Sequence, residues 1–233
     1  MKIIAHRCGT DIFPQQTIHG ARYSLKNGVD LVEVDIRFTS DGVPVVIHDE
    51  TPLSLCGTDT PVKEMTAEKF LSLRRTDDPA FCSHSFKDYL DCGIRKMLFH
   101  IKEGGEKLNT VLDMCREYEI LGDVFFGVTS ADDVKIVKNY DASVKVLGFM
   151  PKPECTADFA AAGADYIRLW QKWLTDENIE AVGKSGKKLW IMAKNGDVGE
   201  AEESDYALFE STGADGVLIN EVIPAIKYYK RNG

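Results

Sequence analysis

Short apolar segments alternate with amphipathic segments from one end of this 233-residue chain to the other. Apolar runs of this length are candidates for buried strands, and segments with apolar residues three and four apart are candidates for helices. Strands that alternate with helices are typical of a parallel sheet covered by helices. The strand candidates are residues 2–6, 31–37, 97–102, 124–129, 145–150, 166–170, 189–193 and 216–220.

The segments between these strands end in a way that is typical of helices. Glycine stands at positions 28, 163, 186 and 213, shortly before the next strand begins. Glycine is common at that point because it readily adopts the left-handed conformation that closes a helix. The predicted helices occupy residues 17–27, 106–120, 131–140, 154–163, 175–185, 200–212 and 222–230.

One apolar run interrupts the alternation. Residues 43–48 have the pattern of a strand, but only Thr39-Ser40-Asp41-Gly42 separates them from the strand before. Four residues are too few for a parallel crossover, whereas Asp-Gly between two strands is a strong hairpin signal. With the run counted as an antiparallel excursion, eight strand–helix units remain, the number that closes a (β/α)₈ barrel. A doubly wound open sheet is the alternative, but no G-x-G-x-x-G follows the first strand.

The longest departure from the repeat is an insertion at residues 51–95. Within it we predict helices at 66–73 and 85–92 and a loop at Thr76-Asp77-Asp78-Pro79. Its apolar content is low for a separate core. We therefore expect the insertion to cap the mouth of the barrel, within a single domain of residues 1–233.

Composition limits the partners and the location of the protein. The net charge of −9 and the pI near 5.1 argue against a nucleic-acid partner. Six cysteines without C-x-x-C spacing favour reduced thiols and a cytoplasmic location. Met1-Lys2 runs directly into an apolar strand, so no secretory leader is expected. No apolar run approaches the roughly 20 residues of a membrane span, so integral membrane association is not expected.

Several ionisable side chains interrupt the apolar strands or end them. Such groups cost free energy in apolar surroundings unless they find partners or a metal. In a barrel the C-terminal ends of the strands face the active site, so these side chains would converge there. They are His6, Arg7, Glu33, Asp35, His48, His100 and Lys102.

Glu33 and Asp35 are candidate metal ligands. Strand alternation puts both carboxylates on one face, within reach of a single ion. With the hairpin turn centred between Ser40 and Asp41, His48 would lie opposite Glu33. Carboxylate oxygens favour hard ions such as Mg²⁺ or Ca²⁺. An ion-pair network with neighbouring arginine and lysine side chains is the alternative role for the two carboxylates.

The remaining charged groups suit acid–base chemistry on a phosphate. Two imidazoles at strand ends, His6 and His48, can work as a neutral and protonated pair near pH 7. A lone His6 would more often be a satisfied core histidine. Arg7 and Lys102 suit non-bridging phosphate oxygens, and neutralising the carboxylates is their alternative role.

Two side chains on later strands are weaker candidates. Trp190 opens the seventh strand and could stack on a substrate or form part of the barrel wall. Arg168, in Arg168-Leu169-Trp170 at the end of the sixth strand, could enter the mouth of the barrel.

Taken together, the motifs resemble those of the glycerophosphodiester phosphodiesterase family. Its members carry His-Arg-Gly, Pro-Glu-Asn-Thr, Glu-x-Asp and His-Asp in this order. The turn at Thr39-Ser40-Asp41-Gly42 is similar to the family's Thr-x-Asp-Gly, and Gly213-Ala214-Asp215-Gly216-Val217 is similar to its closing strand. The segments that match the four motifs are His6-Arg7-Cys8, Pro14-Gln15-Gln16-Thr17, Glu33-Val34-Asp35 and His48-Asp49. Together with the turn and the closing strand, they span nearly the whole chain.

The resemblance implies a TIM barrel, which agrees with the (β/α)₈ barrel, the β-hairpin and the small insertion after the second strand that the sequence pattern predicts. It also implies hydrolysis of glycerophosphodiesters to glycerol 3-phosphate and an alcohol. The implied residues are His6 and His48 as general acid and base, Glu33 and Asp35 as metal ligands, and Arg7 and Lys102 as phosphate contacts.

The chain departs from the family pattern at three places. His100-Ile101-Lys102 stands where the family has Glu-x-Lys, whose Glu is a metal ligand. His100 in that role makes the site softer and less negative, which favours Mn²⁺ or Zn²⁺ beside the Mg²⁺ or Ca²⁺ implied by the family. Glu103 follows directly, with its side chain expected on the opposite face. Pro-Gln-Gln-Thr replaces Pro-Glu-Asn-Thr, and Cys8 replaces glycine.

Our primary interpretation is a metal-dependent phosphodiesterase that acts on a small glycerophosphodiester. One divalent ion would be held by Glu33, Asp35 and His100. The nucleophile is either water or the glycerol hydroxyl of the substrate. The alternatives are a phospholipase-D-like lyase that leaves a cyclic phosphate, and a catalytically degenerate barrel that binds a phosphodiester without cleaving it.

Overall fold

A closed barrel of eight parallel strands forms the centre of the computed structural model, which describes residues 1–76 and 78–230. Asp77 of the predicted loop lies outside the described residues. Each barrel strand pairs with the next one along the chain, and β1 pairs with both β2 and β10, which closes the sheet. The predicted (β/α)₈ architecture is confirmed. The barrel strands are β1 (Lys2–Ala5), β2 (Leu31–Phe38), β5 (Met97–Ile101), β6 (Phe125–Val128), β7 (Lys145–Gly148), β8 (Tyr166–Trp170), β9 (Lys188–Met192) and β10 (Gly216–Ile219).

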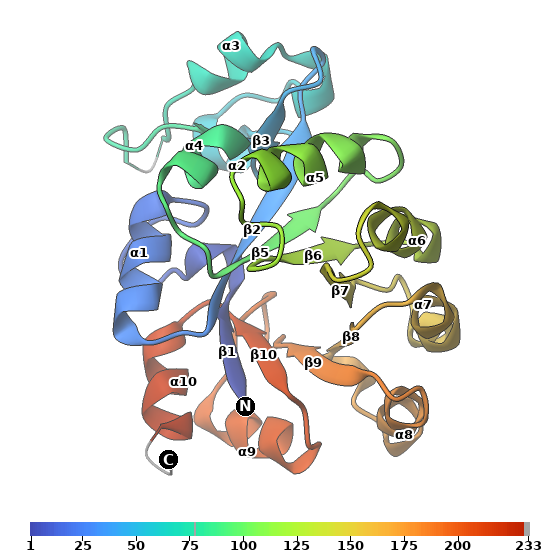
Figure 1. Ribbon diagram of the computed structural model, residues 1–233. Coiled ribbons are helices and arrows are strands. Elements are labelled where there is room, and N and C mark those ends of the chain that lie inside the picture. The colour runs from blue at the N-terminus through green and yellow to red at the C-terminus, as the bar shows by residue number, and fades with distance from the viewer. Residues whose placement is uncertain (77, 231–233) are drawn as a thin grey trace.

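Eight of the described helices follow the barrel strands and surround the sheet (Figure 1). Several begin at a hydroxyl side chain that accepts a hydrogen bond from a backbone amide three residues on, as Thr17 and Thr175 do. Every predicted helix is present, and most are shorter at their ends. The helices are α1 (Ile18–Asn27), α4 (Phe86–Asp91), α5 (Lys107–Glu117), α6 (Ala131–Tyr140), α7 (Thr156–Ala162), α8 (Asp176–Lys184), α9 (Glu203–Ser211) and α10 (Val222–Tyr229).

The barrel strands are buried on both faces, which explains their nearly continuous apolar sequences. Along β2, Val32, Val34 and Ile36 belong to the large apolar cluster between the strands and the helices. Leu31 belongs to a second cluster inside the barrel. Because side chains alternate along a strand, Glu33 and Asp35 share the inward face with Leu31. The fold thus directs both carboxylates into the barrel.

The hairpin is present, but its register differs from the prediction by one residue. Strand β3 (Pro44–Val46) runs antiparallel to β2, with Ile36 opposite Val46. The turn is longer than predicted because Val43 belongs to it, accepting a hydrogen bond from the Thr39 amide at 3.1 Å. Since β3 ends at Val46, His48 lies beyond the ladder and is not paired with Glu33. The prediction that His48 faces Glu33 across the hairpin was therefore wrong.

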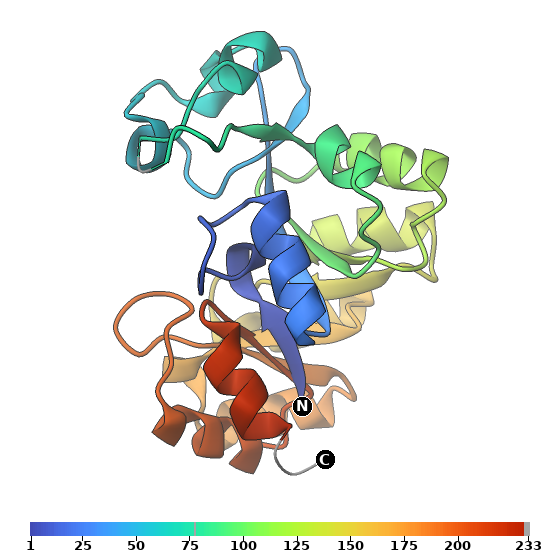
Figure 2. The ribbon, with the colours of Figure 1, turned by 90° about the vertical axis from the view of Figure 1, so that its left-hand side faces the viewer.

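The insertion packs on the hairpin through a small apolar cluster of its own. Strand β4 (His84–Ser85) extends β3, and helices α2 (Leu53–Cys56) and α3 (Ala67–Leu71) lie in the connecting chain. Figure 2 shows the insertion on the same side of the barrel as the loop between β9 and α9. Although the insertion has few apolar residues, it therefore shares a local core with the hairpin. This core consists of Val45 and Ile47 of the hairpin and of Val62, Met65, Phe70 and Leu73 of the insertion.

Short 3-10 turns also occur in the described ranges. They are η1 (His6–Cys8), η2 (Val62–Glu64), η3 (Pro153–Cys155) and η4 (Gln171–Trp173).

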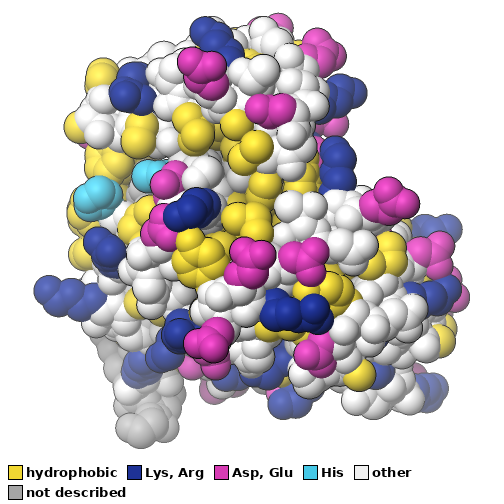
Figure 3. Space-filling model, turned by 45° about the horizontal axis from the view of Figure 1, so that its top comes forward, with side chains coloured by type: hydrophobic (Ala, Val, Ile, Leu, Met, Phe, Trp, Pro, Cys, Tyr) yellow, Lys and Arg dark blue, Asp and Glu magenta, His cyan; other side chains and the backbone are white. Residues whose placement is uncertain are grey.

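Acidic and basic side chains are interspersed on the face of the molecule shown in Figure 3. Of the helices in the described ranges, none combines the length and the apolar character needed to span a membrane. No disulfide joins any of the six cysteines, all of which are described.

Candidate active site

A cavity of about 340 Å³ opens at the C-terminal ends of the barrel strands. Five of the predicted residues line it, namely His6, His48, His100, Lys102 and Arg168. They lie at or just beyond the ends of β1, the hairpin, β5 and β8, so the barrel brings together groups that lie far apart in sequence. The remaining wall comes from β6 to β9 and the loops that follow them, and it consists of Thr129, Phe149, Met150, Pro151, Trp170, Met192 and Val198.

Glu33, Asp35 and His100 form a buried cluster at the base of this site. Nδ1 of His100 lies 3.0 Å from Oδ1 of Asp35 and 3.4 Å from Oε1 of Glu33. One donor atom from each of the three residues lies within 4.8 Å of the others. The His100 ring stacks on Phe149 with ring centroids 3.8 Å apart, which fixes its orientation. Gly127 makes room for Phe149, because a Cβ at that position would overlap its ring.

The electrostatics of the cluster favour a cation. Burial and the neighbouring Asp35 raise the pKa of Glu33 well above its usual value. Burial also disfavours the charged form of Asp35, but Lys102, whose Nζ lies 2.7 Å from Oδ1, and His100 hold its pKa well below the usual value. Burial and Lys102 lower the pKa of His100 to about 3, so this imidazole is neutral. The protein thus presents a carboxylate, a second carboxyl that resists ionisation and a neutral imidazole.

This donor set fits a divalent metal ion. Oε1 of Glu33 accepts no hydrogen bond from any described residue, although it is buried. Buried oxygens normally have a partner, and a cation shared with Asp35 and His100 would supply one. Two oxygen donors and one imidazole nitrogen form a ligand set that Mn²⁺ and Zn²⁺ accept as well as Mg²⁺.

Arg7 and Gln16 hold the outer oxygens of the two carboxylates. The Arg7 amide donates to Oε2 of Glu33 at 2.8 Å, and Nε2 of Gln16 donates to Oδ2 of Asp35 at 2.6 Å. Arg7 adopts a left-handed conformation, with φ of 49°, which turns its amide toward Glu33. Oε1 of Gln15 accepts a hydrogen bond from Nη1 of Arg7 at 2.9 Å. The two glutamines of the unusual Pro-Gln-Gln-Thr segment therefore orient the cluster, a role that the sequence did not indicate for Gln16.

His6 is oriented by Asn220, which the sequence analysis missed. Nδ1 of His6 lies 2.6 Å from Oδ1 of Asn220, and Nδ2 of Asn220 donates to the carbonyl of Val198 at 2.9 Å. Because the amide nitrogen is engaged, Oδ1 faces the imidazole and Nδ1 must carry the proton. Nε2 of His6 is then the unprotonated nitrogen. Burial and Arg7 lower the pKa of His6 to about 3, so it stays neutral.

Gly199 is required for this contact. Its φ of +88° suits glycine, and a Cβ there would lie 2.7 Å from Nδ1 of His6 and would overlap the side chain of Asn220. The only sequence signal for Asn220 is its position directly after the last strand, 214 residues from His6.

His48 is held by different partners. Nδ1 of His48 lies 2.7 Å from Oδ1 of Asp49, whose other oxygen accepts a hydrogen bond from Ser54 at 2.8 Å. Burial lowers the pKa of His48, although its side chain remains 33% exposed. Its carbonyl accepts from Nε of Arg37, which also pairs with Glu103 at 2.8 Å. Glu103 is therefore engaged with Arg37, away from the cluster.

Trp190 does not lie where a substrate contact was predicted. Its side chain is fully buried inside the barrel, with ring centroids 4.8 Å from Tyr166 and 5.4 Å from Phe125. It does not line the cavity, whereas Trp170 does. The strand pattern predicts which face a residue occupies, but it does not predict the level along the barrel axis. We therefore withdraw Trp190 as a substrate-binding residue.

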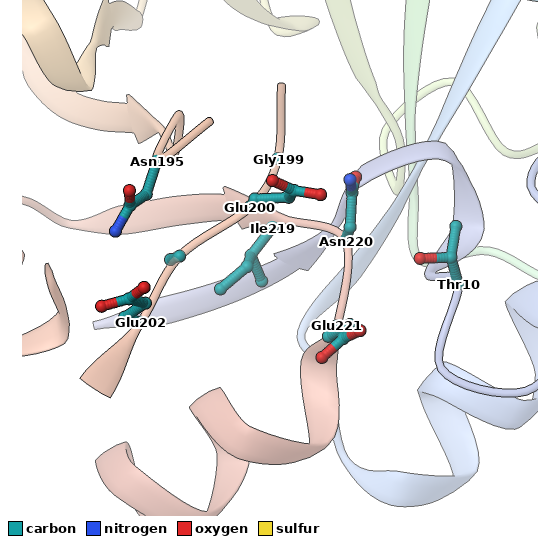
Figure 4. Close-up of a pocket in the computed structure, with 9 residues that line it drawn as sticks. Thr10, Asn195, Gly199, Glu200, Glu202, Ile219, Asn220 and Glu221 are labelled. Atoms are coloured by element: carbon teal, nitrogen blue, oxygen red, sulfur yellow. The ribbon is translucent and has the colours of Figure 1, made fainter. Parts of the chain in front are cut away.

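A second cavity, of about 270 Å³, is lined by Asn220 (Figure 4). Three carboxylates line it, from Glu200, Glu202 and Glu221. Like charges would repel a phosphate there. The larger cavity, with its lysine, arginine and histidine side chains, is the better candidate for binding an anion.

Comparisons with known sequences identify the family of the chain. Residues 6–148, more than half of the chain, match the model of the Glycerophosphoryl diester phosphodiesterase family. Glycerophosphodiester phosphodiesterase 1 of Rattus norvegicus is 54% identical over 48 residues, which cover 21% of this chain and 14% of that protein. The glycerophosphodiester phosphodiesterase of Caldanaerobacter subterraneus subsp. tengcongensis is 31% identical over 124 residues, covering 53% of this chain and 42% of that protein. The matched segments thus span less than half of these relatives.

Solved structures with the same fold cover nearly the whole chain. The crystal structure of a glycerophosphodiester phosphodiesterase from Agrobacterium tumefaciens str. C58 superposes with a TM-score of 0.76 and 20% identity, covering 94% of this chain and 96% of that chain. The corresponding protein from Thermotoga maritima has a TM-score of 0.77 and 18% identity, covering 97% and 96%. At these identities the likeness establishes the fold.

Proposed function

The chain belongs to the glycerophosphoryl diester phosphodiesterase family, and on this basis we propose that it hydrolyses glycerophosphodiesters to glycerol 3-phosphate and an alcohol. The observation that carries the proposal is the convergence of His6 and His48 on one cavity beside the cluster of Glu33, Asp35 and His100. We also propose a small-molecule substrate and a cytoplasmic location, which the cysteines without disulfides support.

Glu33, Asp35 and His100 are the residues that would hold one divalent ion. When bound, such an ion neutralises phosphate charge and polarises an oxygen of the reacting group. Lys102 and Arg7 add positive charge on the same side of the site, 2.7 Å and 3.9 Å from oxygens of Asp35. These charges favour a transition state in which negative charge builds up on the phosphate oxygens.

The partners of the two histidines support different roles for them. His48 contacts the Asp49 carboxylate, which opposes the lowering of the His48 pKa by burial, so we assign it as the general acid that protonates the leaving alkoxide. His6 contacts the neutral amide of Asn220 and keeps Nε2 unprotonated. We assign His6 as the general base that removes the proton of the nucleophile.

The direct test is hydrolysis of glycerophosphocholine and related diesters with Mg²⁺, Ca²⁺, Mn²⁺ or Zn²⁺. We expect turnover with at least one ion and none in EDTA, because the carboxylate pair needs a cation to accept the substrate. Phosphorus NMR of the product separates hydrolysis from a lyase reaction, which would leave a cyclic phosphate. Binding of the diesters without cleavage under all four ions would contradict the proposal and favour a degenerate barrel.

Substitution of Asn220 should impair catalysis without removing a reacting group. Asn220→Leu deletes the acceptor that fixes the His6 tautomer, and we expect kcat to fall roughly 10- to 100-fold with KM little changed. Asn220→Asp keeps an acceptor and adds a negative charge, which raises the pKa of His6. The acid limb of the kcat/KM profile should therefore move to higher pH. Wild-type rates and an unchanged profile in both variants would show that Asn220 does not position His6.

A further inference from the structure

Arg168, at the end of β8, is a buried cation without a matching anion. It is 4% exposed and lines the cavity. Nη2 lies 3.4 Å from the carbonyl of Met150, whereas Nε and Nη1 have no hydrogen-bond partner among the described residues. No ion pair within 4.0 Å joins it to a carboxylate of the described chain. Burying an unpaired charge is costly, so a guanidinium held in this way points to an anion that arrives with a ligand.

The other cations around the site are already engaged. Lys102 pairs with Asp35, and Arg37 pairs with Glu103. Arg7 donates to Gln15 and lies 3.9 Å from Asp35. Each of these three therefore balances a group of the protein before any substrate binds. Within the described part of the cavity wall, Arg168 has a charge without an anionic partner, and its Nε and Nη1 have no hydrogen-bond acceptor.

Arg168 lies across the barrel from the two carboxylates and contacts Phe149, the ring that stacks on His100. The order of strands in the barrel places β8 on the opposite side from β2, which carries Glu33 and Asp35. Apolar groups surround it, since the rings of Trp170 and Phe149 lie 4.3 Å and 5.3 Å from its guanidinium carbon. An anion bound here would be sheltered from water, where a charge-assisted hydrogen bond is strong.

The charge of the whole site agrees with a substrate that is more negative than a simple diester. Because a histidine stands beside the two carboxyl groups of the cluster, the cluster has no third acidic residue. In the proposed reaction, Lys102, Arg7 and a bound divalent ion would face the reacting phosphate. A substrate with a single phosphodiester charge therefore does not need the additional positive charge of Arg168 on the opposite wall.

Resting on the function proposed above, we propose that Arg168 selects glycerophosphodiesters whose alcohol carries a second anionic group, a carboxylate or a phosphate. The alcohol would lie against the apolar wall of Phe149 and Trp170, with its anion accepting hydrogen bonds from the Arg168 guanidinium. The reacting phosphate would lie across the mouth, near Lys102.

The first experiment compares glycerophosphoserine with glycerophosphoethanolamine, which differ by one carboxylate. We expect kcat/KM to favour the serine diester by roughly tenfold or more in the wild type. Arg168→Gln should bring the ratio close to one, mainly by slowing the serine diester, and Arg168→Lys should retain part of the preference. Lys194→Gln is the matched control, because Lys194 is exposed and its Nζ lies 6.0 Å from the same Trp170 ring. A ratio near one in the wild type, or an equal loss on both diesters in Arg168→Gln, overturns the proposal.

A binding experiment separates this proposal from the proposed activity. Both diesters are titrated with Mn²⁺ into His48→Ala, which keeps the three cluster residues but should not turn over, and binding is followed by intrinsic tryptophan fluorescence, to which Trp170 and Trp173 beside the guanidinium contribute. Tighter binding of the serine diester that is lost when Arg168→Gln is added supports the selectivity even if the wild type cleaves neither diester, in which case the proposed activity fails alone. Equal affinities in His48→Ala overturn the selectivity even where the wild type hydrolyses both diesters.

Discussion

Replacing either His6 or His48 with alanine is expected to abolish measurable turnover and leave the fold intact. Both imidazoles line the cavity, and each holds Nδ1 against a protein acceptor, which leaves Nε2 for the substrate. Loss of a general acid or base lowers rates by roughly 10²- to 10⁴-fold. The two losses should not add, since the reaction needs the acid and the base in the same transition state.

Initial rates and thermal unfolding of the same preparations check this expectation. His48→Ala is the cleaner variant, because His48 is partly exposed, whereas His6→Ala leaves Oδ1 of Asn220 without its donor at a cost of roughly 1–3 kcal/mol. His19→Ala is the matched control, since His19 is exposed on α1 against Phe13 and Phe81. Wild-type rates in either active-site variant would remove that histidine from the mechanism.

Glu33→Gln is expected to change stability and metal binding in opposite directions. Glu33 and Asp35 are both fully buried, and burial with Asp35 raises the pKa of Glu33 because two adjacent charges are unfavourable. Glutamine has nearly the same shape and keeps an oxygen for the Arg7 amide. In EDTA the variant should therefore unfold at the same temperature as the wild type or a higher one. Its affinity for a divalent ion should fall by roughly a hundredfold or more, because a charged ligand is lost.

Thermal unfolding with and without Mn²⁺ separates the two effects. Binding to the native state stabilises it according to the ion concentration relative to Kd, so the wild type should gain in Tm and Glu33→Gln should gain little. Glu103→Gln serves as the control, because Glu103 pairs with Arg37 outside the cluster. It should unfold at a lower temperature and still respond to the ion. A full Mn²⁺ response in Glu33→Gln would mean that the ion binds elsewhere.

The architecture could be predicted from the sequence because each strand, helix end and turn is marked by residues that lie close together in the chain. Strands buried on both faces are continuously apolar, and the helices between them end at glycine. A short Asp-Gly connection distinguishes the hairpin from a ninth barrel strand. The cluster of Glu33, Asp35 and His100 follows from the same logic, since parallel strands bring their C-terminal ends to one side of a barrel.

The details that could not be predicted depend on geometry that a local pattern does not encode. The hairpin register changed by one residue because Val43 joined the turn. Trp190 lies on the inward face of β9, but it packs inside the barrel beside Gly216 and not at the mouth. The absence of a side chain at Gly216 makes room for its ring. Nothing in the local sequence marks Asn220 as a partner of His6, because only the closed barrel brings the two residues together.

The contact between His6 and Asn220 also orders events during synthesis of the chain. His6 and the three residues of the cluster all precede Ile101, the last residue of β5, so they emerge from the ribosome early. The side chain that sets the tautomer of His6 follows β10, the last strand to emerge, and β10 pairs with β1. A nascent chain can thus contain all three proposed metal ligands while His6, the proposed base, is still free to rotate. The appearance of activity would then report the moment at which the last strand joins the first.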